Sequence, residues 1–115
     1  MDPSTPSDRR REPRQPVNAY GRIWYGPQYG LWADCRISDR SASGARIEIA
    51  AVYRLPRRLV FVQYGADQIF EAVLKWQRGD AAGLALTPTS ASTQAQPWFE
   101  RILRETVALK NAGVS

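Results

Sequence analysis

Short runs in which hydrophobic and polar residues alternate fill the middle of the chain, as half-buried β-strands do. The clearest run places Leu31, Ala33, Cys35 and Ile37 on one face. Turn residues separate it from five further runs rich in β-branched and aromatic residues. The six predicted strands cover residues 17–25, 31–37, 45–49, 58–64, 69–77 and 83–87. We therefore predict a mainly β domain over residues 17–90, a six-stranded antiparallel barrel that leaves no strand edge unpaired.

The strand pattern also predicts the setting of individual side chains. Residues 38–44 are mostly polar, so we expect a loop there. Farther along, Trp76 continues the face that Phe70 and Leu74 begin in the strand at 69–77. Cys35 shares its face with apolar neighbours, so we interpret it as a small core residue rather than a reactive thiol.

The two ends of the chain differ in composition from the strand-rich middle. Residues 1–16 contain four of the eight prolines and an arginine cluster, but no large apolar residue beyond Met1, so we expect a flexible arm. Residues 97–110 predict a helix, with Pro97 in its first turn and Gly113 beyond its end. We expect the apolar side of this helix to lie on the barrel or on a second subunit. That side comprises Phe99, Ile102, Leu103, Thr106 and Val107.

The residue types present exclude several kinds of site. The chain has no histidine, and Cys35 is its only cysteine. A disulfide framework, a Cys/His zinc site and any histidine-based triad are therefore excluded. The carboxylates are not clustered, so we expect neither an enzyme nor a bound metal or cofactor. No apolar run approaches the roughly 20 residues of a membrane span, which predicts no membrane insertion and a cytoplasmic protein.

The cationic residues are almost all arginines. The formal charge is +5, from 16 Lys+Arg against 11 Asp+Glu, and lysine occurs only at Lys75 and Lys110. Because the guanidinium is planar, permanently charged and able to form paired hydrogen bonds, arginine suits recognition of phosphate and guanine. The bias indicates an anionic partner, although a basic chain can also bind nucleic acid or simply be soluble.

Two short polar clusters carry the candidate chemistry. The first is RRREPR at residues 9–14, which contains the pattern RxxxR at Arg10 and Arg14. The second is DRSASG at residues 39–44, which has the pattern DxSxxG and leads into a predicted strand. Taken singly, the first can be a solvated tail or a nucleic-acid arm, and the second can be ordinary turn chemistry that ends at a turn glycine.

Together, in this order and spacing, the two motifs resemble those of the PilZ domain family. The segments VLKW at residues 73–76 and GLAL at residues 83–86 are also similar to the family's barrel strands. The resemblance covers roughly residues 9–88 and leaves the predicted helix as an addition. It implies a PilZ-type barrel that binds the bacterial second messenger cyclic di-GMP.

The resemblance also implies roles for individual residues. Arg10 and Arg14 would hold phosphate and guanine, and Asp39 with Ser41 would read the guanine edge. Gly44 would permit a close backbone approach or a positive φ at the start of its strand. The chemistry agrees, because cyclic di-GMP offers two phosphates and two guanines, and a carboxylate accepts from the N1–H and N2–H groups of guanine.

Four other residues are candidates for additional contacts. In the PilZ family an arginine directly before RxxxR tends to go with a stacked pair of cyclic di-GMP molecules, so Arg9 implies that the ligand binds as a dimer. Arg11 in the arm and Arg46 on the strand after the DxSxxG motif are further candidates. Trp76 is interpreted either as an aromatic that stacks beside the site or as a core residue.

The main functional interpretation is a binding module that changes its surface when it binds cyclic di-GMP and signals to an unidentified downstream protein. One alternative is a PilZ-like adaptor that binds no nucleotide, against which the two intact motifs argue. Another is a small basic barrel that binds single-stranded nucleic acid, whose affinity would fall more steeply with salt. Nucleic acid is not the expected partner, and the sequence is compatible with either a monomer or a homodimer.

Overall fold

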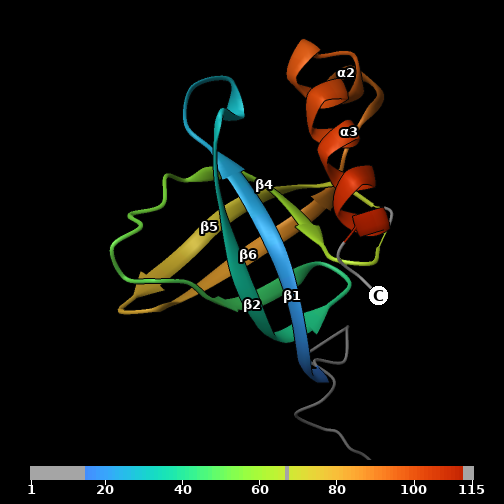
Figure 1. The fold of residues 1–115 in the computed structure, drawn as a ribbon. Coiled ribbons are helices and arrows are strands. Elements are labelled where there is room, and N and C mark those ends of the chain that lie inside the picture. The colour runs from blue at the N-terminus through green and yellow to red at the C-terminus, as the bar shows by residue number, and fades with distance from the viewer. Residues whose placement is uncertain (1–14, 67, 113–115) are drawn as a thin grey trace, which may run out of the picture.

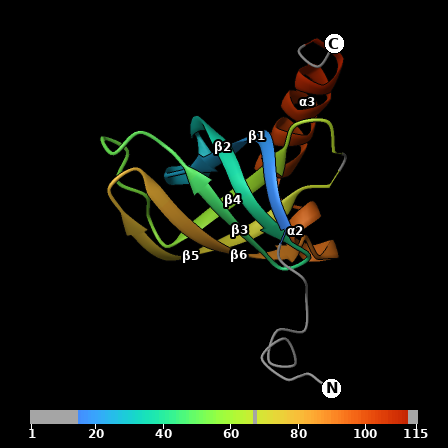
Figure 2. The ribbon, with the colours of Figure 1, turned by 90° about the horizontal axis from the view of Figure 1, so that it is seen from below.

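The computed structural model describes residues 15–66 and 68–112, whose strands close into a single antiparallel barrel (Figures 1 and 2). Around the barrel the strands follow the order β1-β2-β3-β6-β5-β4. Their bounds are β1 (Gln15–Tyr25), β2 (Leu31–Ser41), β3 (Gly44–Glu48), β4 (Arg58–Gln63), β5 (Phe70–Arg78) and β6 (Ala81–Pro88). The mainly β fold and the six-stranded barrel that the alternation predicts are confirmed.

The inward-facing side chains of the strands fill the barrel. Ile37, Ile47 and Phe61 have no exposed surface, and burial of a side chain of this size stabilises the fold by about 1.5–3 kcal/mol. Cys35 is also buried, and burial raises the pKa of its thiol to about 12. The interpretation of Cys35 as a core residue is therefore confirmed. Leu31, at the start of the same predicted face, is instead 53% exposed because it lies at the end of the barrel.

The connection between β2 and β3 differs from the polar loop predicted over residues 38–44. β2 continues through Ser41 and β3 begins at Gly44, so a two-residue turn joins them. This part of β2 pairs with β3 on one side and with β1 on the other, where Gln15 lies opposite Arg40. The loop prediction was wrong because it relied on hydrophobic alternation, which stops before this segment. Hydrogen bonding to β1 and β3 on both sides keeps these polar residues in a strand.

Helical segments flank the strands. A 3-10 turn, η1 (Pro27–Tyr29), joins β1 to β2 where the sequence predicts a turn, and the predicted helix is α3 (Pro97–Ala112). A short helix before it, α2 (Ala91–Gln94), was not predicted. Ser90 begins α2, since its hydroxyl accepts a hydrogen bond from the Thr93 backbone N–H at 3.2 Å.

The long helix α3 lies along the outside of β1 and β4 rather than at an end of the barrel (Figures 1 and 2). Phe99 and the fully buried Ile102 form a buried cluster with Trp24 of β1. The other members of this cluster are Val60, Val62 and Ile69. The helix therefore covers its own barrel, which is one of the two predicted arrangements. Leu103 and Val107, from the predicted apolar side, are 40% and 49% exposed.

Candidate ligand-binding site

A β-bulge in β2 turns Asp39 to the outside of the barrel. Ile37 faces the interior opposite Ile47, and strict alternation would turn residue 39 inward as well. The register shifts after Ile37, however, and Asp39 lies opposite Arg46, an exposed residue of β3. Ser38 is the extra residue, and its hydroxyl donates to the Arg46 carbonyl oxygen at 3.3 Å. Bulges redirect the side chains that follow them, and here the redirected side chain is the aspartate of the DxSxxG motif.

A second bulge, in β5, has the same effect on Trp76. Leu74 lies opposite Leu84 but Trp76 lies opposite Gly83, so Lys75 is the extra residue. The prediction that Trp76 shares the inner face of Leu74 is wrong for this reason. The Trp76 side chain is 38% exposed on the outside of the barrel, which favours the surface interpretation over core burial.

The two bulges bring four residues into one line across four neighbouring strands. Asp39 lies opposite Arg46, which lies opposite Gly83, which lies opposite Trp76. We call these four residues the outer row. It crosses β2, β3, β6 and β5, and at about 4.8 Å per strand spacing it spans about 14 Å. Because α3 packs on β1 and β4, the outer row lies on the side of the barrel away from the helix.

Trp76 forms a flat platform at one end of the outer row. A Cβ on Gly83 would lie 2.2 Å from the Trp76 indole nitrogen, so only glycine lets the indole lie against the strand. The guanidinium carbons of Arg46 and Arg78 lie 5.4 Å and 5.9 Å from the Trp76 ring centroid. An aromatic ring flanked by guanidinium groups can stack with a planar base and attract an anion. Gly83 was not predicted as a site residue, although a glycine within a strand is a signal of close packing against its backbone.

The first strand begins beside the other end of the outer row. Pro16 lies opposite Asp39, and Gln15 lies opposite Arg40, the second residue of the DxSxxG motif. Arg14, the last residue of RxxxR, directly precedes Gln15 in the sequence. Barrel closure therefore begins β1 beside the DxSxxG motif, at the residue that follows RxxxR in the sequence. The predicted contacts Arg9, Arg10, Arg11 and Arg14 themselves lie outside the described residues.

Ser41 and Gly44 form the last pair of the β2–β3 hairpin. Gly44 is buried, and it lacks the positive φ that was one of its two predicted roles. Among the described glycines, a positive φ occurs instead at Gly26, Gly65 and Gly79. The other predicted role of Gly44, a close backbone approach, stays a prediction.

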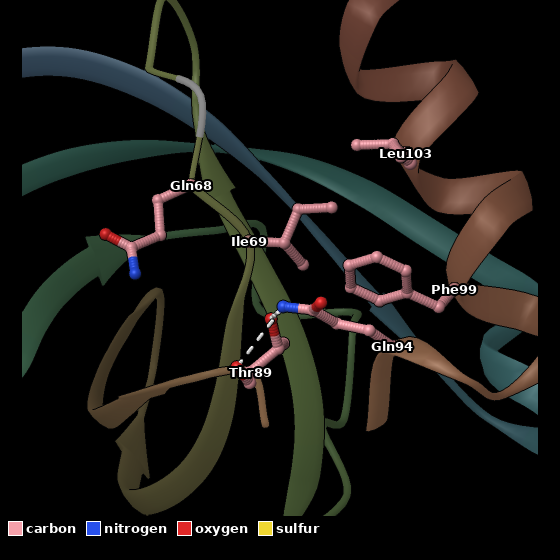
Figure 3. A pocket seen from close by; sticks show the side chains of 6 residues that line it. All are labelled: Gln68, Ile69, Thr89, Gln94, Phe99 and Leu103. Atoms are coloured by element: carbon pink, nitrogen blue, oxygen red, sulfur yellow. Dashed lines mark hydrogen bonds between the residues drawn. The ribbon is translucent and has the colours of Figure 1, made fainter. Parts of the chain in front are cut away.

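A separate cleft of ≈ 340 Å³ lies on the helix side, between α3 and the segment that leads into β5 (Figure 3). The residues that line it are Gln68, Ile69, Thr89, Gln94, Phe99 and Leu103. The Gln94 side-chain amide donates to the Thr89 hydroxyl across its floor at 3.2 Å. None of these lining side chains is charged, so they offer a phosphate no balancing cation. The outer row, with its arginines, is the better candidate for an anionic ligand.

Residues 15–66 and 68–112 contain neither a metal-binding group of side chains nor a membrane-spanning helix. No three His, Cys, Asp or Glu side chains come together there in a group able to hold a metal ion. In the same part of the chain, no helix has both the length and the apolar character needed to cross a membrane.

Comparison with known proteins decides the fold. No protein-family model matches the chain, and no curated protein matches it. A solved structure does match, the PilZ domain of CeSA from a cellulose-synthesizing bacterium, with a TM-score of 0.56 and 14% sequence identity. The match covers 80% of this chain and 95% of that one. The chain has the PilZ fold.

The PilZ barrel brings together all the predicted site residues that lie in the described part of the chain. Asp39, Arg46 and Trp76 share the outer row, and Ser41 and Gly44 close the hairpin beside it. At 14% identity the structural similarity establishes the PilZ fold alone. The case for a ligand therefore depends on the residues of this chain.

Proposed function

We propose that this PilZ-type domain is a receptor for cyclic di-GMP and that the ligand lies along the outer row. The single observation that carries the proposal is the strand register, which aligns Asp39 with Arg46 and Trp76 and begins β1 beside Asp39. The PilZ fold and the two sequence motifs support the same ligand. The domain acts by binding rather than by catalysis. A partner protein then recognises the surface formed by the ligand and the arm.

The two ends of the outer row suit different parts of the ligand. The Asp39 carboxylate has two acceptor oxygens, of which Oδ1 is buried, and in the proposed complex the carboxylate faces the neighbouring N1–H and N2–H donors of guanine. The Trp76 ring offers a face on which a base can stack, an interaction of about 1–3 kcal/mol. Arg46 lies between them, and its guanidinium suits a phosphate. The row therefore holds groups for base edge, phosphate and base face in that order.

The arm supplies further arginines within reach of the whole row. Arg14 is one residue and Arg10 five residues before Gln15, where β1 begins. An extended chain covers about 3.4 Å per residue, so the Arg10 backbone can lie up to about 17 Å from that point. This reach exceeds the length of the outer row, about 14 Å at ~4.8 Å per strand spacing. The flexible arm predicted over residues 1–16 lies mostly outside the described residues; an arm that became ordered only on binding would cost conformational entropy and lower the affinity below what the contacts alone would give.

Calorimetric titration tests the proposal because it measures affinity and stoichiometry together. We expect saturable binding of cyclic di-GMP and no comparable binding of cyclic di-AMP, because adenine presents an acceptor at N1 to the Asp39 carboxylate. A single-stranded oligonucleotide, titrated at two salt concentrations, tests the nucleic-acid alternative. Oligonucleotide binding that weakens steeply with salt, in a protein that does not bind cyclic di-GMP, would contradict the proposal.

We expect Trp76→Ala to weaken cyclic di-GMP binding by about 5-fold to 150-fold, the equivalent of one base-stacking contact of about 1–3 kcal/mol. Gly83→Ala should also weaken binding, since its Cβ would displace the same indole. Trp32→Ala is the matched control, because Trp32 is 49% exposed, lies 3.7 Å from the Arg22 guanidinium and is outside the outer row. Equal losses in the Trp32 and Trp76 variants would argue against a platform at Trp76.

We further propose that two cyclic di-GMP molecules bind per chain, stacked on each other, and that Arg9 decides this. Its guanidinium is next in sequence to the RxxxR pair and can contact the second ligand while Arg10 and Arg14 hold the first. In titrations, Arg9→Leu should bind one ligand where the wild type binds two. Arg104→Leu, which removes an exposed arginine of α3, should still bind two. Saturation of the wild type at one ligand would exclude the dimer, and two ligands in Arg9→Leu would exclude the role of Arg9.

A further inference from the structure

The turn between β2 and β3 has an uncommon backbone for a two-residue hairpin. Such turns favour types I′ and II′, in which one or both turn residues have a positive φ, because the twist of these turns matches that of the strands. Here the turn residues are Ala42 and Ser43, and neither has a positive φ. A turn of the opposite twist tends to splay the two strands. This hairpin therefore needs other contacts to hold its end closed.

Arg40 provides such a contact from inside the barrel. It lies opposite Ala45, which has no exposed surface, so the phase of the strand directs its side chain inward. Its guanidinium carbon lies 5.0 Å from the Phe70 ring centroid. Its Nη1 group donates to the Ser41 carbonyl oxygen and, at 3.4 Å, to the Gly44 carbonyl oxygen. One guanidinium thus links the two residues at which the strands end.

The surroundings of Arg40 would accommodate an apolar side chain as well as a cation. Phe61 and Phe70, the rings nearest its guanidinium, are both buried core residues. Replacing a charge in such a place by a hydrophobic residue of similar volume is often neutral or stabilising. The contacts with the turn therefore give a reason for an arginine at this position that apolar packing alone does not give.

We propose that Arg40 is a positioning residue for the nucleotide site. Asp39 and Ser41 flank it in the strand, on the opposite phase, and both belong to the motif. By holding the turn closed before the ligand arrives, Arg40 orders the backbone that carries these two side chains, which reduces the entropy lost on binding. The inference rests on the proposed function, because it concerns how the cyclic di-GMP site is held.

The test measures three properties of Arg40→Leu and Arg40→Lys: affinity for cyclic di-GMP, thermal unfolding, and amide exchange of residues 42–44 without nucleotide. Leucine should leave Tm unchanged or raise it, weaken binding by about tenfold, and speed exchange in the turn. Lysine can still donate to both carbonyl oxygens, so it should keep the affinity within about threefold of the wild type.

Arg101→Leu is the matched control for these variants. Arg101 donates to the carbonyl oxygens of Gln28 and Tyr29 at 2.7 Å and 2.8 Å. Like Arg40, it links a guanidinium to two backbone carbonyl groups of a turn, but at η1 rather than at the β2–β3 turn. Its loss should affect thermal stability and leave the affinity for cyclic di-GMP unchanged.

Three results would overturn the inference about Arg40. The first is wild-type affinity in Arg40→Leu, and the second is unchanged amide exchange in its turn. The third is that Arg40→Leu and Arg40→Lys both lose Tm and affinity, to the same extent. The last of these would make Arg40 a structural residue only. A wild-type protein that binds no cyclic di-GMP would instead refute the proposed function. The exchange measurement, made without nucleotide, would then still show whether Arg40 holds the turn.

Discussion

Replacing Asp39 with alanine is expected to weaken cyclic di-GMP binding by about 30-fold to 1,000-fold without unfolding the domain. In the proposed complex its carboxylate accepts two hydrogen bonds from guanine, and loss of such charge-assisted contacts corresponds to about 2–4 kcal/mol. The bulge at Ser38 places Asp39 on the outside of the barrel, so the truncation leaves no cavity in the core. Calorimetric titration measures the loss, and thermal unfolding verifies the fold.

Further variants make the Asp39 experiment specific. Asp39→Asn keeps the shape of the side chain but turns one acceptor into a donor, so it faces a guanine N–H with an NH₂ group and should bind almost as weakly as alanine. Asp80 is an exposed carboxylate between β5 and β6, and Asp80→Ala should bind like the wild type. Arg10→Ala and Arg14→Ala should each lose as much affinity as Asp39→Ala. Wild-type affinity in folded Asp39→Ala would show that the site assignment is wrong.

The alternation of side chains predicted the strands because a barrel strand has one buried face. This alternation can be read from each short segment of sequence without knowing which strands pair. The rule fails at Ser38 and Lys75, where one extra residue reverses the phase of all the residues that follow in the strand. Both are ordinary residues with no local signal of a bulge. The outward direction of Asp39 and Trp76, on which the candidate site depends, therefore became visible only from the strand pairing.

Contacts between distant segments could not be predicted either. The sequence associates the RxxxR and DxSxxG motifs only through a family resemblance, whereas the pairing of Gln15 with Arg40 shows that β1 begins beside the DxSxxG motif. In the same way, only the strand pairing shows that Trp76 lies against Gly83. Arg40 occupies a variable position of its motif, and its inward direction follows from its pairing with Ala45.

Helical spacing predicted α3, but it did not show what the helix covers. The run at residues 59–62 carried a signal, because Leu59, Val60, Phe61 and Val62 are all buried and a strand buried on both faces lacks alternation. One face of this run belongs to the barrel interior, and the other face is covered by α3 together with Trp24 of β1. A continuous apolar run in an otherwise alternating barrel thus indicates where a helix docks.

Replacing Ile102 with alanine is expected to lower the free energy of unfolding by about 2–5 kcal/mol, a large part of the roughly 5–15 kcal/mol typical of a domain. Ile102 has no exposed surface and lies in the cluster beneath α3 that contains Trp24, so its truncation leaves a cavity. Leu103→Ala is the control on the same helix. Leu103 is 40% exposed, and the change should be about 1 kcal/mol or less. Urea unfolding followed by tryptophan fluorescence measures both.

The same Ile102→Ala variant should bind cyclic di-GMP like the wild type under conditions in which it remains folded. The helix packs on β1 and β4, whereas the outer row crosses β2, β3, β6 and β5, so a cavity beneath α3 leaves the row intact. The Trp24 indole N–H donates to the Glu105 carboxylate at 2.8 Å, and this bond should keep the helix docked in the variant. Equal destabilisation by Ile102→Ala and Leu103→Ala would contradict the orientation of α3. A loss of affinity in folded Ile102→Ala would mean instead that the helix and the nucleotide site are coupled through the barrel.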